Sequence, residues 1–261
     1  MSRSTHDIHG KPYNRTMMII LLLIATFAGV LNQTSLGTAI PTLMKSFDIS
    51  LSTAQQATTW FLLANGIMIP VSAFLATRFS TKWLSFSAYF LLIIGLLMTT
   101  FAPTSNWYIF PIGRVIQACA VGISMPLMQV VMVHVFPPEQ RGVAMGLNGL
   151  VVGLAPAVGP TLAGWVLKQN FNLFGHDLTW RGIFILPLAI VAVALFLPPF
   201  IVKDFVDNKR VKLDMISLFL SILGFGSFLW GFTNVADKGW GDMTYVLAPI
   251  ILGLLIIALF A

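Results

Sequence analysis

Long windows without a charged residue divide this sequence into eight apolar segments. Each window has about the 20 apolar residues that a helix needs to cross the hydrocarbon core of a bilayer. Apolar runs of this length are typical of membrane-spanning helices rather than of buried helices in soluble domains. The predicted spans cover residues 17–40, 56–77, 83–102, 107–135, 142–166, 182–201, 214–233 and 245–261.

Composition places the whole chain in the membrane class. Hydrophobic residues make up 57% of the 261 residues and charged residues 9%, whereas about 25% of residues are charged in ordinary soluble domains. So few charges could not cover the surface of a water-soluble protein of this size. We therefore expect an all-α, multi-pass protein of the cell membrane, either an inner or a plasma membrane.

The first span has a second interpretation. Three basic residues precede the apolar stretch 17–31, and Ser35-Leu36-Gly37 resembles the small residues of a secretory cleavage site. Seven further spans favour a retained helix, because the first helix of a multi-pass protein sets its topology.

Lysine and arginine residues are distributed unequally between the two sides of the predicted membrane. Ten lie in the tail and loops on the side of the N-terminus, four lie on the other side, and Arg114 lies inside a span. Cytoplasmic loops carry the excess of Lys and Arg, so we expect a cytoplasmic N-terminus. This distribution also explains the net charge of +6 without a nucleic-acid partner.

The densest run of charges divides the chain. We predict a cytoplasmic tail over 1–16, a six-helix bundle over 17–202, a cytoplasmic loop over 203–212 and a trailing pair of helices over 213–261. The loop reads as a solvated connector that anchors the adjoining helix ends. The chain ends at the apolar pair Phe260-Ala261, and we expect it to be a truncated piece of a longer transporter.

Few residues could support enzyme chemistry. The single cysteine, Cys119, excludes an intrachain disulfide and a cysteine metal cluster. The four histidines form no ligand pattern, and the sequence has no phosphate-binding loop, dinucleotide fingerprint or nucleophile–base motif. We expect no enzyme activity, no metal and no cofactor.

The fourth and fifth spans carry motifs of a known family. Gly113-Arg114-Val115-Ile116-Gln117-Ala118 resembles the motif G-R-x-x-Q-G. Gly146, followed by the segment 155–164, resembles the antiporter motif G-x8-G-x3-G-P-x2-G-G. Glu139-Gln140-Arg141-Gly142 matches E-x-R-G at the start of the fifth span. These segments resemble the major facilitator superfamily, specifically its fourteen-spanning drug:proton antiporters.

Other segments extend the resemblance over nearly the whole chain. The segment from Leu31 to Pro41 resembles L-D-x-T-x-x-N-x-A-L-P, and Trp180-Arg181 opens the sixth span in the family manner. Leu213-Asp214, with Gly239-Trp240 later, resembles the extra helix pair between the two bundles of these antiporters. Within the family, Asn32-Gln33-Thr34 and Asn65-Gly66 resemble the lincomycin-resistance branch.

The sequence departs from the family at several motif positions. Asn32 stands at the acidic position of the first span, and Gly37 replaces the later asparagine. The loop motif G-x-L-A-D-R-x-G-R-K appears as the segment 73–82, which keeps Arg78 and Lys82 but lacks the acid and the second glycine. The acid that would form a charge-pair latch at this loop is therefore absent.

The resemblance implies a fold and a function. The fold would be a six-helix bundle of two inverted three-helix repeats, followed by two further helices. The function would be proton-driven efflux of drugs or related amphipathic small molecules, with a second bundle needed for activity. The alternatives are an inactive N-terminal fragment of such a transporter, or a substrate:proton symporter, which the antiporter motif disfavours.

Polar residues inside the spans are the candidate site, because polar side chains cost free energy against lipid and should face the bundle interior. Arg114 and Gln117 are the candidate coupling pair. The alternative role is helix–helix hydrogen bonding without contact to substrate. The polar candidates for substrate binding are Asn32, Gln33, Thr34, Asn65 and Gln129. Trp60 and Met125 are candidates because they could line an adaptable apolar cavity, and the alternative for each of these two is packing against lipid. The candidates for the conformational motifs are Gly159, Pro160, Gly164, Arg78 and Lys82.

Arg114 is the most informative single residue. It lies about 10 Å into the membrane at 1.5 Å per residue, where an arginine costs about 2.5–3.5 kcal/mol on insertion scales. Snorkelling of its long stem toward the interface is the alternative to a coupling role.

All nine acidic residues fall in tails, loops or helix ends. A proton-coupled exporter needs a titratable group whose protonation competes with substrate. We therefore expect the proton carrier to lie in the second bundle.

Overall fold

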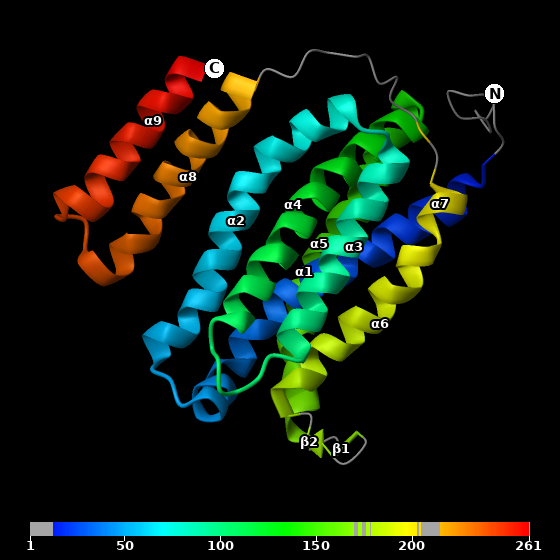
Figure 1. Ribbon diagram of the computed structural model, residues 1–261. Helices are drawn as coiled ribbons and strands as arrows, with labels where there is room; N and C mark the ends of the chain where they lie inside the picture. Colours follow the sequence, from blue (N-terminus) through cyan, green and yellow to red (C-terminus); the bar gives the residue numbers. More distant parts are fainter. Residues whose placement is uncertain are drawn as a thin grey trace.

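A computed structural model describes residues 13–169, 172–173, 176–177, 179–202, 204 and 215–260 of the chain (Figure 1). Most of the predicted tail 1–16 and of the predicted loop 203–212 lies outside these residues. The long helices are α1 (Arg15–Phe47), α2 (Leu51–Arg78), α3 (Thr81–Thr100), α4 (Ile109–Val135), α5 (Pro138–Lys168), α6 (Gly182–Phe196), α8 (Met215–Lys238) and α9 (Ala248–Phe260). The shorter elements are β1 (Asn172–Leu173), β2 (His176–Asp177), η1 (Thr179–Arg181), α7 (Pro198–Ile201) and η2 (Met243–Leu247).

The helices confirm the all-α membrane fold. Seven of them are long and apolar enough to cross a membrane, and the eighth predicted span forms a shorter apolar helix over Met243–Leu259. Two-residue strands β1 and β2 pair antiparallel in the segment between α5 and α6. Everything else that is regular in the described residues is helical.

Several helix ends differ from the predicted spans. The helix α1 continues through Pro41 to Phe47 and ends where Asp48 takes a left-handed conformation (φ 52°). The predicted sixth span is interrupted at Leu197, because prolines begin the short helix α7 and proline lacks the backbone N–H that would continue the ladder. A charge-free window in the sequence indicates which residues can lie in lipid. It does not indicate at which residue the helix ends, because a helix can continue beyond the lipid.

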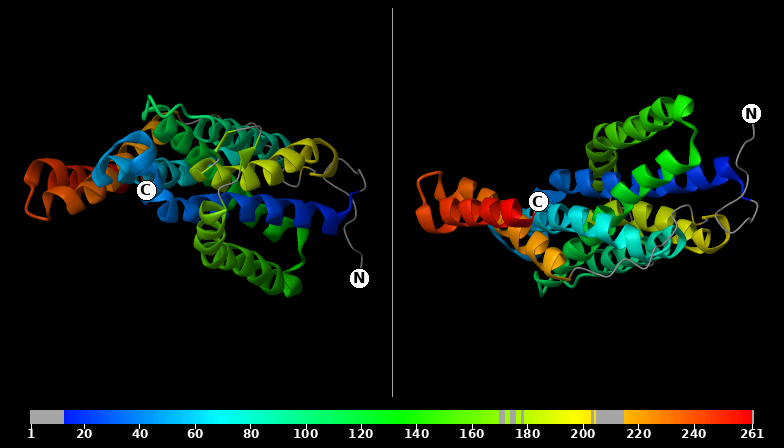
Figure 2. Two further views of the ribbon diagram at one scale, coloured as in Figure 1. Left: turned by 90° about the horizontal axis from the view of Figure 1, so that it is seen from below. Right: turned by 90° about the horizontal axis from the view of Figure 1, so that it is seen from above.

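Helix α4 is central among the first six long helices. The helices α2 and α3 both lie along α4, α3 also contacts α6, and α1 lies along α5. Figure 2 shows α5 to one side of the other helices, next to α1. The buried core therefore centres on α1, α3 and α4, while α2 and α5 have mostly accessible surfaces.

Aromatic side chains close one end of this core. Phe47, Trp107, Phe110, Trp180 and Phe184 pack with ring centroids 5.1–6.3 Å apart. Such edge and offset contacts add to the free energy of burying large rings. The cluster joins the end of α1 to the starts of α4 and α6.

The helices α8 and α9 form a hairpin that packs against α2. Glycines allow the close approach: a Cβ on Gly231 would lie 2.6 Å from Ile250 Cγ1, and one on Gly253 would lie 2.7 Å from the Gly224 carbonyl oxygen. Leu229 of α8 covers Gly66 of α2. Small residues at helix contacts are the usual means of packing helices in lipid.

Gly95 tests the crossing of α3 and α4. A Cβ there would lie 2.7 Å from both Gln117 Cγ and the Gly113 carbonyl oxygen. We expect Gly95→Ala to lower the free energy of unfolding by about 1–3 kcal/mol, as overpacking does. Gly146→Ala is the matched control, since a Cβ there meets nothing within 4 Å. Thermal unfolding in detergent measures the stability of both variants. Equal unfolding midpoints for the two variants would contradict the close contact of α3 with α4 at Gly95.

Candidate functional site

A cluster of buried polar side chains lies where α1, α3 and α4 meet. Asn32 comes from the middle of α1, and Arg114 and Gln117 come from the first half of α4; all three are fully buried. Gly95 and Thr99 of α3 complete the cluster. Three helices that are distant in sequence therefore meet at one polar centre inside an apolar bundle.

Gln117 is the centre of the cluster. Its Oε1 accepts hydrogen bonds from Asn32 Nδ2 at 2.8 Å and from Arg114 Nη1 at 2.7 Å. Its Nε2 donates to the Gly95 carbonyl oxygen and to Thr99 Oγ1, both at 2.8 Å. An amide side chain has two acceptor sites and two donor hydrogens, so Gln117 uses its full hydrogen-bonding capacity to join three helices.

The sequence of α3 and α4 makes these bonds possible. Gly95 and Gly113 face each other across the crossing, where added Cβ atoms would fall 2.7–3.0 Å from the opposing backbone. Without side chains at these positions, the α3 backbone comes within reach of Gln117. Thr99 follows Gly95 by one turn and places its hydroxyl on the same face.

Arg114 is held inside the bundle and does not reach an interface. It has no exposed surface, and its Nη1 also lies 3.4 Å from the Asn32 carbonyl oxygen. The guanidinium lies over the ring of Phe61 from α2, with Cζ 4.3 Å from the ring centroid. Its location excludes the snorkelling interpretation, which needs the charged tip in water.

The cluster leaves hydrogen-bonding positions and a charge unmatched. Within the described part of the chain, Arg114 Nε and Asn32 Oδ1 are buried without a hydrogen-bond partner. The described acidic side chains lie near helix ends, in turns or in loops, and none of them is bonded to Arg114. A buried cation without a carboxylate is costly, so this part of the site attracts a negative charge.

A cavity of about 220 Å³ lies between α1, α4 and α5. Its walls combine apolar side chains with uncharged polar groups and contain no ionised residue. The lining residues are Thr26, Met125, Gln129, Asn148, Gly149 and Val152. Ligand pockets usually measure about 300–1,000 Å³, so this cavity holds only part of a drug-sized molecule.

The structure separates the predicted substrate-binding residues. Met125 and Gln129 line the cavity, whereas Asn32 lies in the polar cluster. Asn65 faces α4, where a Cβ on Gly122 would lie 3.1 Å from Asn65 Oδ1. Trp60 and Gln33 are half-buried and lie outside the cavity lining.

Thr34 and the unpredicted Ser35 join α1 to the antiporter motif of α5. Thr34 Oγ1 lies 3.5 Å from the Ala155 carbonyl oxygen, and Ser35 Oγ lies 3.3 Å from the Gly159 carbonyl oxygen. A Cβ on Gly159 would collide with Thr34 Oγ1. Gly159 therefore packs on α1, while Pro160 is exposed.

The remaining motif residues lie near helix ends. Arg78 is exposed at the end of α2, and the backbone N–H of Lys82 donates to Asp204 Oδ1 at 3.1 Å near the start of α3. Thr77, at the acidic position of the loop motif, donates to the Phe74 carbonyl oxygen. A Cβ on Gly164, near the end of α5, would make only an ordinary 3.9 Å contact with Thr38 Cγ2.

The prediction missed Thr26, Asn148 and the α3 half of the polar cluster. Thr26 and Asn148 were visible as isolated polar residues inside charge-free windows. Gly95 and Thr99 form a small-x3-small pair, which is typical of close helix contacts in membranes. Neither pattern indicates which neighbouring helix the residue faces.

Comparison with known proteins identifies the family of this chain. The family model of the Major Facilitator Superfamily matches residues 22–261. The chain belongs to the major facilitator superfamily. In this superfamily each six-helix half contains two inverted three-helix repeats, and α1–α3 and α4–α6 are those repeats.

Curated superfamily relatives match over nearly the whole chain. The Uncharacterized MFS-type transporter YcnB of Bacillus subtilis is 39% identical over 97% of this chain and 52% of YcnB. The Lincomycin resistance protein LmrB of Listeria monocytogenes is 37% identical over 93% of this chain and 49% of LmrB. The Multidrug export protein EmrB of Escherichia coli is 32% identical over 81% of this chain and 40% of EmrB. The chain thus spans about half the length of the curated relatives it matches.

Solved superfamily structures share the fold. A bacterial homolog of the human lysosomal transporter Spinster, in an inward-facing and occupied conformation, superposes with a TM-score of 0.60 at 15% identity, over 96% of this chain and 60% of that protein. The POT family transporter PepTSo superposes with a TM-score of 0.61 at 14% identity, over 94% of this chain and 52% of PepTSo. At these identities the likeness concerns the fold alone.

Gln117 offers a test of the polar cluster. Gln117→Leu keeps a similar volume but removes the acceptor of Asn32 Nδ2 and the shorter hydrogen bond of Arg114 Nη1, while the Gly95 carbonyl oxygen keeps its bond from Thr99 Oγ1. We expect a loss of about 1–3 kcal/mol in the free energy of unfolding, because buried donors, one of them charged, lose their acceptor.

Gln129→Leu is the control for this variant. Gln129 is exposed on the same helix, so we expect a change within about 0.5 kcal/mol. A Gln117→Leu protein as stable as the wild type in detergent unfolding would show that the cluster contributes nothing to stability.

Proposed function

We propose that this chain is one half of an exporter that moves amphipathic small molecules out of the cell in exchange for protons. The observation that carries the proposal is the buried cluster of Asn32, Arg114 and Gln117 at the meeting of the two repeats. The names of two relatives, Lincomycin resistance protein and Multidrug export protein, support export as the direction of transport. The second bundle would complete the pathway, as alternating access requires two bundles around one site.

Arg114 would couple proton and substrate movement through its charge. A carboxylate from the second bundle that approached Arg114 would form a charge-assisted pair with its guanidinium. Protonation of that carboxylate would remove the pair and leave the cation uncompensated. The two protonation states would therefore favour different arrangements of the bundles, which is the physical requirement for coupling.

The cavity between α1, α4 and α5 would hold part of the substrate. Its amides and hydroxyl would bond polar groups, and Met125 offers a flexible, polarizable surface that adapts to different apolar shapes. The lack of ionised groups in the lining favours neutral or weakly charged moieties. The remainder of the substrate would contact the second bundle.

The outer surface of α5 would face the second bundle. Gly142, Gly146 and Gly153 have open space where a Cβ would lie, and Pro160 continues this exposed side. Small residues allow close contact between helix backbones. A helix of the second bundle packed here would seal the pathway, the role that the antiporter motif implies.

Arg114 variants of the complete transporter test the coupling role. We expect Arg114→Lys and Arg114→Ala to insert normally but to lose at least about 90% of concentrative efflux, because an ammonium is a point charge that cannot reproduce the planar fork of donors. The measurement is lincomycin accumulation in inverted vesicles at a fixed proton gradient, normalised to protein in the membrane.

Arg15→Lys is the matched control. Arg15 also lies over a phenyl ring, Phe136, at 3.8 Å, but it is only half-buried and starts α1 at the end of the bundle. We expect Arg15→Lys to keep nearly full efflux. Wild-type rates for Arg114→Lys would remove Arg114 from the coupling mechanism.

Membrane orientation has its own test. Ser105 lies in the exposed turn between α3 and α4, and Glu139 is exposed at the start of α5, on the opposite side. In a Cys119→Ser background, Ser105→Cys should react with an impermeant thiol reagent in intact cells, and Glu139→Cys only after permeabilisation. The reverse pattern would place the N-terminus outside.

A further inference from the structure

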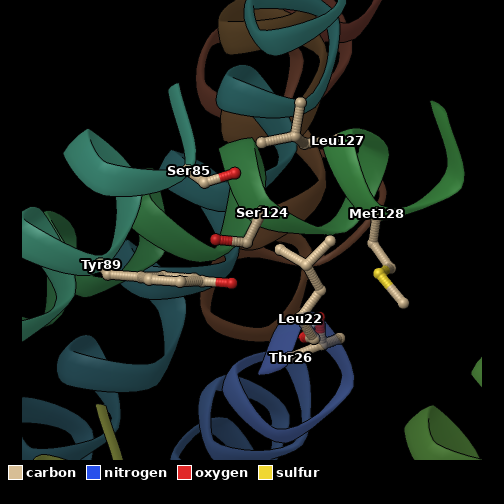
Figure 3. Close-up of a pocket in the computed structure, with 7 residues that line it drawn as sticks. All are labelled: Leu22, Thr26, Ser85, Tyr89, Ser124, Leu127 and Met128. Atoms are coloured by element: carbon tan, nitrogen blue, oxygen red, sulfur yellow. Dashed lines mark hydrogen bonds between the residues drawn. The ribbon is translucent and has the colours of Figure 1, made fainter. Parts of the chain in front are cut away.

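A second, much smaller cavity lies among α1, α3 and α4 (Figure 3). Its volume is about 10 Å³, which is close to the minimum of about 10–15 Å³ that one water molecule needs. Figure 3 shows hydroxyl groups of α3 and α4 directed into the same gap. The lining residues are Leu22, Thr26, Ser85, Tyr89, Ser124, Leu127 and Met128.

Three of the four hydroxyl groups have already donated their hydrogen. Thr26 Oγ1 donates to the Leu22 carbonyl oxygen, Ser85 Oγ to that of Thr81, and Ser124 Oγ to that of Ala120, all at 2.8–2.9 Å. Each of these oxygens keeps acceptor capacity, because a hydroxyl has one donor hydrogen and two lone pairs.

The fourth hydroxyl belongs to Tyr89, and it can supply the hydrogen-bond donor that the other three lack. Its side chain is almost fully buried, and within the described residues its hydroxyl makes no hydrogen bond, so its donor hydrogen remains available. The cavity wall therefore presents one donor and three acceptors. A water molecule, with two hydrogens and two lone pairs, matches this set: it accepts from Tyr89 and donates to two of the other hydroxyls.

We propose that this cavity is a specific site for one structural water molecule, which bridges Tyr89 of α3 to Ser124 of α4 and to Thr26 or Ser85. Buried waters typically make about three such hydrogen bonds to polar groups that would otherwise be unsatisfied. An apolar occupant would leave the Tyr89 hydroxyl without a partner, and any larger ligand exceeds the volume.

The water repeats the role of Gln117 at a second level of the bundle. Ser124 follows Gln117 by about two helical turns on α4, and Thr26 precedes Asn32 on α1 by a similar distance. Gln117 joins α1, α3 and α4 directly, and the water joins α3 to α4, and also α1 when it donates to Thr26, where no side chain spans the gap. Thr26 also lines the larger cavity.

The direct test is a high-resolution structure of the purified protein. We expect a density peak within about 3 Å of Tyr89 Oη and of Ser124 Oγ, and its loss in Tyr89→Phe. A direct Tyr89–Ser124 or Tyr89–Ser85 hydrogen bond, with no peak between the oxygens, would overturn the proposal.

Unfolding measurements give an independent test, because a hydrated cavity and a dry cavity predict opposite effects of Tyr89→Phe on stability. A bonded water makes the Tyr89 hydroxyl stabilising, so Tyr89→Phe should lower the unfolding midpoint by about 2–4 °C. Tyr108→Phe, at an exposed tyrosine (68%), should leave the midpoint unchanged. An unchanged or higher midpoint for Tyr89→Phe would mean that the cavity is dry, because phenylalanine then removes only an unsatisfied hydroxyl.

Discussion

Hydrogen bonding away from water is the constraint on which the rest of this structure depends. In a bilayer, a polar side chain that finds no partner costs several kcal/mol, so hydrogen bonds within the bundle are strongly favoured. Gln117 meets this requirement completely, and in doing so it fixes α1, α3 and α4 relative to one another. The glycines at the α3–α4 crossing follow from the same requirement, since Gln117 reaches the α3 backbone only where Cβ atoms are missing.

Arg114 shows how the same constraint connects structure to transport. Its guanidinium is bonded on one side to Gln117 and lies over Phe61 on another, yet its positive charge has no carboxylate among its described contacts. Such a buried, unpaired charge costs free energy. The proposed coupling role gives the unmatched charge a use, since it would let a second bundle sense protonation.

The helices of the bundle differ in how closely they are packed. The interior around α4 is closely packed, whereas α2 and α5 keep accessible apolar and glycine-rich surfaces. The chain spans about half the length of its curated relatives, and the cavity beside α5 is too small for a whole drug-sized molecule. In the proposed function, helices of a second bundle would complete this site.

The sequence by itself determined the membrane class, the positions of the helices and the family, because charge-free windows and motif spacing are local properties of the chain. It also indicated that Asn32, Arg114 and Gln117 would face inward, since lipid excludes polar groups. Only the tertiary structure decided which partners they have: Gly95 and Thr99 on α3 and Phe61 on α2 come from distant segments. It likewise placed Asn65 against α4 and Gly159 against α1, and it assembled both cavities. Helical periodicity shows which residues lie on the inner face of a helix. The rotation and crossing angle of the neighbouring helices decide which residues lie opposite that face.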